Sequence, residues 1–145
     1  MPYATIAQFV EKFGRDQAIA LSNLDDPQAE EPDGSVLNRS LIDASALMDS
    51  YLAGRYSLPF VSAPQVLIPK CLDIARYFLD KYAAREDVRQ RYEDAIRWLE
   101  LVAKGTIQLG LDALSVEVKR GENLPDFEPG TRVFTNSTLK DFVGE

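Results

Sequence analysis

The chain has 145 residues, of which 46% are apolar and 27% are charged, a balance typical of one globular domain with its own hydrophobic core. It contains no histidine and one cysteine, which excludes an intrachain disulfide, an imidazole-based metal site and the usual histidine-assisted nucleophile. A net charge of -7 argues against a general nucleic-acid binder, and without a basic, apolar leader or a long apolar run we expect neither export nor membrane insertion.

The first predicted helix covers residues 5–14. Thr5 and Gln8 have the spacing of a capping box, in which each side chain bonds the backbone of the other residue. We expect Gly14 to end this helix in the left-handed conformation, and Asp16 to cap a short second helix. The apolar stripe of the first helix recurs at helical three- and four-residue steps: Ile6, Phe9, Val10 and Phe13.

Residues 23–34 predict a loop, because two prolines, a glycine and five carboxylates leave little that could pack. A third helix is expected to begin near Asp33 or Ser35 and to end around residues 54–57. Its predicted buried stripe consists of Leu37, Leu41, Ala44, Met48, Tyr51 and Leu52.

Pro59 and Pro64 predict a second loop before the fourth helix. We expect that helix to begin between Gln65 and Pro69, since proline is tolerated in a first turn. Its predicted stripe contains Cys71, Leu72, Ala75, Phe78, Leu79 and Tyr82.

A fifth helix is predicted from Glu86 to Lys104, with Gly105 just beyond its end. Its apolar stripe is wide, so we expect it to be the most central helix. The stripe comprises Val88, Tyr92, Ala95, Ile96, Trp98, Leu99, Leu101 and Val102.

The helical pattern stops at Thr106, where a short extended segment could follow. The predicted fold is therefore all-α, a small bundle of about five helices (residues 1–110) with an extended C-terminal arm (residues 111–145). The arm is rich in glycine, proline and polar residues, so it is either a terminus without function or a segment that orders against a partner. Four apolar residues are the candidate partner-binding residues of the arm: Val133, Phe134, Leu139 and Phe142.

No residue set in the chain predicts catalysis, a cofactor or a metal ion, and we expect no enzyme. Adjacent acids such as Glu93 and Asp94 point about 100° apart on a helix, and Glu93 has the favourable spacing for an ion pair with Arg97. The acidic loop lacks the glycine and glutamate spacing of a calcium hand. Cys71 is expected to be a core residue. A modest basic and aromatic cluster has acidic neighbours that nearly cancel it: Arg85, Arg89 and Arg91 with Tyr82 and Tyr92.

Three sequence blocks, in this order and spacing, resemble the small neck proteins of Mu-like bacteriophages and prophages, a head–tail adaptor (connector) family. They are "YATIAQFVEKFG", "DASALMDSYLAGRYSLPF", and "CLDIARYFLDKY" joined to "RYEDAIRWLELVAKGTIQLG". The resemblance covers roughly residues 3–110, and "TRVFTNSTLKDF" near the end is also similar. It does not extend to the acidic loop.

The resemblance implies structural work in a virion, at the neck between head and tail, by a protein made in the host cytoplasm. Family adaptors form a ring, usually of twelve copies, on the portal protein, and offer a landing surface to the stopper or tail-terminator protein that follows. Genomic DNA passes through the ring without sequence-specific binding. The residues fit this role, because an acidic channel repels phosphates and an arm can bury Phe134 and Phe142 on a neighbour.

Three other functional hypotheses remain open at this point. The main one is a small cytoplasmic helical interaction protein without a virion role, which predicts a monomer or dimer. An enzyme would need carboxylates held apart from their ion-pair partners in a pocket. A stopper protein that closes the channel is disfavoured, because that role often falls to sheet-rich proteins.

Overall fold

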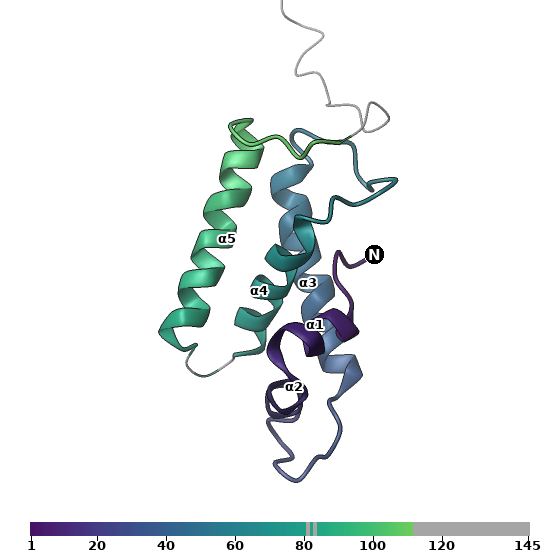
Figure 1. The fold of residues 1–145 in the computed structure, drawn as a ribbon, viewed down its shortest axis with the longest axis vertical. Helices are drawn as coiled ribbons and strands as arrows, with labels where there is room; N and C mark the ends of the chain where they lie inside the picture. Colours follow the sequence, from purple (N-terminus) through teal and green to yellow (C-terminus); the bar gives the residue numbers. More distant parts are fainter. Residues whose placement is uncertain (81, 83, 112–145) are drawn as a thin grey trace, which may run out of the picture.

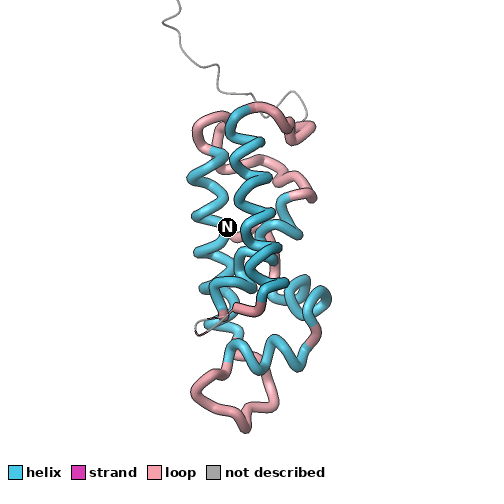
Figure 2. Tube along the Cα trace, turned by 90° about the vertical axis from the view of Figure 1, so that its left-hand side faces the viewer, coloured by secondary structure: helices cyan, strands magenta, loops and turns pink. Residues whose placement is uncertain are grey.

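The computed structural model describes residues 1–80, 82 and 84–111. These residues form five α-helices and no strand, so the predicted all-α bundle is confirmed (Figures 1 and 2). The predicted arm, apart from residue 111, lies outside the described residues. The helices are α1 (Ile6–Phe13), α2 (Arg15–Ser22), α3 (Gly34–Leu52), α4 (Leu67–Leu79) and α5 (Glu86–Lys104).

α3 is the central helix, because it contacts each of the other four. The prediction that the helix from residue 86 to 104 is the most central is wrong. α5 packs mainly on α4 and α3 at one side of the bundle (Figure 1). Its stripe is wide in sequence, but Ile96, Trp98 and Leu101 are only partly buried.

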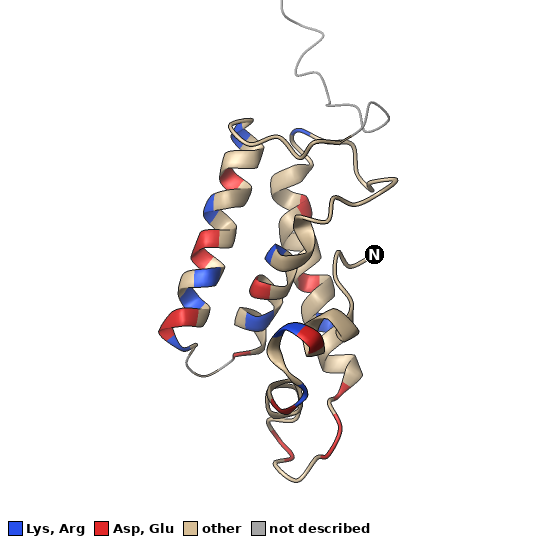
Figure 3. Cartoon of the chain, viewed as in Figure 1, with Lys and Arg blue, Asp and Glu red and all other residues tan. Residues whose placement is uncertain are grey.

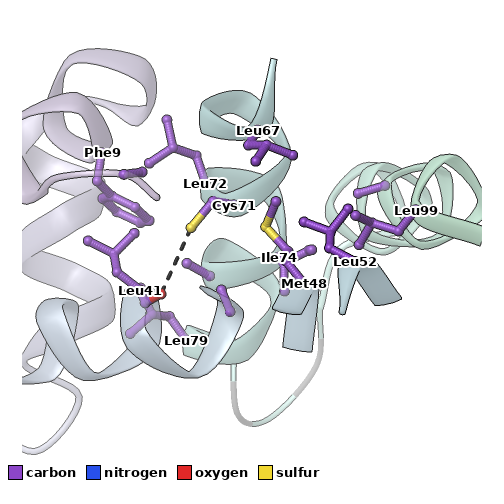
Figure 4. Packing of buried hydrophobic residues seen from close by; sticks show 14 of the residues in the cluster. Phe9, Leu41, Met48, Leu52, Leu67, Cys71, Leu72, Ile74, Leu79 and Leu99 are labelled. Carbon is purple, nitrogen blue, oxygen red and sulfur yellow. Dashed lines mark hydrogen bonds between the residues drawn. The ribbon is translucent and has the colours of Figure 1, made fainter. Parts of the chain in front are cut away.

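One continuous core joins the helices (Figure 4). Five residues of the stripe predicted for the third helix are fully buried, and Tyr51 is partly buried. Phe9 of α1 packs into the same cluster, and its neighbours on the α1 stripe are partly buried around it. Burial of a Leu, Met or Phe side chain stabilises a fold by about 1.5–3 kcal/mol, so this shared core holds the bundle together.

The capping box of α1 is present as predicted: the Gln8 N–H donates to Thr5 Oγ1, and the Thr5 N–H donates to Gln8 Oε1. Gly14 follows α1 at φ 90° and ψ 151°, a conformation open to glycine but more extended than the expected left-handed turn. Asp16 does not cap α2, because the N-cap position falls on Gly14 and places Asp16 inside the first turn. Its negative charge there still complements the helix dipole.

α3 begins as predicted, with the Asp33 carboxylate accepting hydrogen bonds from the N–H groups of Ser35 and Val36. The helix ends at Leu52, slightly before the expected range. α4 carries Pro69 in its first turn, also as predicted.

Tyr82 was expected on the buried stripe of α4, and this prediction is wrong. The backbone leaves the helical conformation at Asp80 (φ -85°, ψ 77°). Tyr82 therefore lies beyond the helix and is 85% exposed.

α5 has the predicted bounds, and Gly105 ends it in the left-handed conformation at φ 83° and ψ 8°. The following residues are neither helix nor strand, and they cross the end of the bundle toward the end of α3 (Figure 1). Leu109 is buried, and its N–H donates to the hydroxyl of Tyr56 at 3.3 Å. This bond attaches the described C-terminal end to the chain just after α3.

Candidate interaction surfaces

The charged face of α5 is a network of surface ion pairs. Arg89 bonds both carboxylate oxygens of Glu86 at 2.8 Å. Arg97 pairs with Asp94 at 3.6 Å, so the expected pair between Arg97 and Glu93 is wrong. Each of these side chains is more than half exposed, and such pairs contribute little to stability.

The basic and aromatic cluster does not form one patch. Tyr92 stacks on Tyr77 with ring centroids 4.1 Å apart and planes inclined by 12°. Arg85 lies 3.6 Å from a carboxylate oxygen of Asp87, and Arg89 is held by Glu86. The acidic neighbours therefore compensate these arginines, as predicted from the sequence.

Cys71 is a core residue, as predicted. Its Sγ lies 3.4 Å from Ser45 Oγ and 3.9 Å from the carbonyl oxygen of Leu41 (Figure 4). Burial raises the pKa of the Cys71 thiol. A buried, protonated thiol is a poor nucleophile.

Within residues 1–80, 82 and 84–111, no group of three or more His, Cys, Asp or Glu side chains is arranged to hold a metal ion. In the same part of the chain, every helix falls short of the length or the apolarity needed to cross a bilayer. Two surfaces of the described residues stand out by their composition.

The first surface is the uncharged loop, defined here as residues 56–69, of which the last three form the start of α4. It forms the longest stretch of the sequence without a charged residue, fourteen positions in a chain that is 27% charged. It joins α3 to α4 and projects from the side of the bundle (Figures 1 and 3). Val61 is 90% exposed and Val66 is 41% exposed, so apolar side chains of this loop face solvent.

Aromatic contacts fix the base of the uncharged loop. The ring of Phe60 lies 6.2 Å from that of Tyr3 and 6.0 Å from that of Tyr56, between centroids. Tyr3 is itself held on α3, since its N–H donates to Ser45 Oγ at 2.9 Å and its hydroxyl donates to Asp49. Phe60 is therefore held in place, and the exposed Val61 follows it directly in the chain.

The second surface is the acidic loop, defined here as residues 23–33, at the opposite end of the molecule (Figure 3). It is held by polar contacts: Asn23 Nδ2 donates to the carbonyl of Glu31 at 2.9 Å, the Asp33 N–H donates to Ser22 Oγ at 2.8 Å, and Arg15 pairs with Glu31. Its other acidic side chains at the tip face solvent: Asp25, Asp26 and Glu30.

The four arm residues predicted to bind a partner lie outside the described residues: Val133, Phe134, Leu139 and Phe142. The uncharged loop was missed as a candidate surface at the level of the sequence. The signal that could have found it is the absence of charge from residue 56 to residue 69.

Comparison with known proteins identifies the family. The model of the family described as Bacteriophage Mu, Gp36 matches residues 3–124. The chain is 44% identical over 117 residues to the Mu-like prophage FluMu protein gp36 of Haemophilus influenzae, covering 81% of this chain and 82% of that protein. It is 30% identical over 143 residues to gene product J of Escherichia phage Mu, covering 99% of this chain and 100% of that protein. The expected resemblance to a Mu-like phage family is thereby confirmed, and the chain belongs to the Bacteriophage Mu Gp36 family.

Proposed function

We propose that this protein is a head–tail connector of a tailed bacteriophage particle, with a structural and non-catalytic role. In this proposal it docks on the portal protein and forms a ring of about twelve copies that extends the DNA channel. The next neck protein, a stopper or tail terminator, then attaches to the ring. The protein is made in the host cytoplasm and ends in the neck of the virion.

The observation that carries this proposal, beside the family, is the chemical difference between the two ends of the bundle. The acidic loop presents exposed carboxylates at one end, and the uncharged loop presents exposed valines near the other (Figure 3). A connector must bind its own neighbours in the ring as well as other neck proteins, and surfaces of different chemistry let it distinguish these partners. A ring also requires contacts between unlike faces of neighbouring copies.

The charge of the chain supports passage of DNA through the ring without sequence-specific binding. The net charge is -7, and the arginines at the start of α5 are compensated by acidic neighbours. A net negative charge repels phosphates, and compensated arginines attract them only weakly. The arm residues Val133, Phe134, Leu139 and Phe142 would bury their side chains on the portal or on a neighbouring copy.

Mass photometry of the full chain, alone and with its cognate portal protein, tests the proposal. We expect a monomer alone and a ring on the portal, because the portal supplies the surface on which assembly begins. A small cytoplasmic interaction protein would instead remain a monomer or dimer in both samples, and that result would refute the connector role.

A further inference from the structure

The uncharged loop is an exposed apolar surface that no described part of the same chain covers. Besides Val61 and Val66, its exposed residues include Pro59 and Ala63, and none of its side chains offers a charge to a partner. An apolar surface of this kind gains free energy mainly by burial against other apolar groups. Its occupant should therefore be an apolar segment.

The loop needs little ordering before it binds. Phe60 is held between Tyr3 and Tyr56, which fixes the backbone next to Val61. A surface that is already ordered loses less conformational entropy on association, so even a short segment can bind it. The uncharged loop can therefore bind a short apolar segment although the surface that it offers is small.

The position of the described C-terminal end points to one such segment. The Leu109 N–H bonds Tyr56, the first residue of the uncharged loop, so the chain beyond Leu111 starts at the base of this loop. Residues 112–145 follow, and they carry two groups of apolar residues in a mostly polar sequence: Val133 with Phe134, and Leu139 with Phe142. Aromatic side chains bury large areas and are frequent anchors of interfaces.

The length of the connection allows the arm to reach the loop of another copy. Residues 112–132 separate the described end from Val133. A connection of this length reaches about 25 Å on average as a random coil and about 70 Å when extended. A globular unit of about 110 residues has a radius of gyration of about 13 Å. A few residues would suffice to reach the loop of the same copy, whereas this connection can reach the next one.

We propose that the uncharged loop of one copy binds residues 133–142 of a neighbouring copy, linking adjacent subunits of the ring. Val61 and Val66 would pack against Phe134 and Phe142 in this contact. The inference rests on the proposed function, since it requires a ring. It assigns the arm to the neighbouring subunit and leaves the portal to other surfaces.

Photo-crosslinking of the portal-bound assembly tests the inference. The photoreactive residue p-benzoylphenylalanine replaces Val61 in the full chain, and copies labelled with ¹⁵N are mixed with unlabelled copies that carry no photoreactive residue. We expect crosslinks from position 61 to residues 133–142 that join labelled to unlabelled copies. Crosslinks only within one copy, or to any other site or protein, overturn the inference.

A pair of matched variants provides a second measure. Val61→Asp should weaken ring formation on the portal by about tenfold or more, because a carboxylate replaces a buried apolar group. Ile42→Asp makes the same change at a 47% exposed residue of α3 and should leave ring formation within about twofold. Rings that form equally well with both variants overturn the inference but not the connector role, whereas no ring with the unchanged chain overturns both.

Discussion

Replacement of Gly105 by alanine tests how α5 is joined to the end of α3. Gly105 holds φ 83°, which alanine adopts only at a cost, and a Cβ there would overlap Nη1 of Arg55 and lie 2.8 Å from its Cζ. The guanidinium of Arg55 also lies over the Tyr56 ring, 5.9 Å from its centroid. An alanine at this position must therefore displace Arg55.

The expected cost of Gly105→Ala has two parts. The left-handed conformation costs alanine about 1–2 kcal/mol, and the lower entropy of the unfolded chain offsets about 0.4–1 kcal/mol of this. Displacing a cation from the C-terminal end of a helix costs about 0.3–1 kcal/mol more. We therefore expect a loss of about 1.5 kcal/mol in the free energy of unfolding.

Gly110→Ala is the matched control, because Gly110 has φ 62° and an added Cβ would meet nothing within 4 Å. It should cost about 1 kcal/mol. Urea titrations followed by circular dichroism at 222 nm measure both losses. In an Arg55→Ala background, the loss caused by Gly105→Ala should fall to that of the control. An equal loss from Gly105→Ala with and without Arg55 would refute the steric reasoning.

Three further predictions follow from buried groups and from the arm. Arg76 is only 8% exposed, its Nε has no hydrogen-bond partner, and it pairs with Asp80 at 3.4 Å. Arg76→Met alone leaves the Asp80 carboxylate without this partner and should lower the urea midpoint, whereas Arg76→Met combined with Asp80→Leu should leave the midpoint unchanged or raise it. Burial raises the pKa of Cys71, so the folded state holds the thiol proton more tightly than the unfolded state. The free energy of unfolding should therefore fall as the pH rises above about 8.5. Cys71→Ala should make this fall less steep in urea titrations at pH 8–10. If the stability of Cys71→Ala falls with pH as steeply as that of the unchanged chain, Cys71 is not the group responsible. Deletion of residues 130–145 should abolish portal-bound rings in mass photometry and leave the helical circular-dichroism signal nearly intact. Complete rings that still form on the portal after the deletion would contradict the role of the arm.

Local signals in the sequence were sufficient for most helix ends. The Thr5–Gln8 capping box and the Asp33 N-cap are contacts between near neighbours, so their spacing defines them before any tertiary packing. The same holds for the end of α5 at Gly105. The cap of α2 was predicted at Asp16, but Gly14, two residues earlier, occupies the N-cap position, and its conformation starts the helix at Arg15.

Tertiary packing decided what the sequence could not. Arg76 lies on the buried side of α4, although a charged residue in a helical pattern is normally assigned to solvent. The width of an apolar stripe does not show how many other helices pack against it. α5 was therefore predicted to be the central helix, whereas α3 contacts all four others. The contacts among Tyr3, Tyr56 and Phe60 join segments far apart in sequence, and no local pattern predicts them.

The most direct test of the connector role is cryo-electron microscopy of the tailed particle produced by the phage or prophage that encodes this protein. For a connector we expect a ring of copies of this helical bundle between portal and tail, with the acidic loop and the uncharged loop facing different neighbours. A neck built without this protein, or copies of it located elsewhere in the particle, would contradict the connector role.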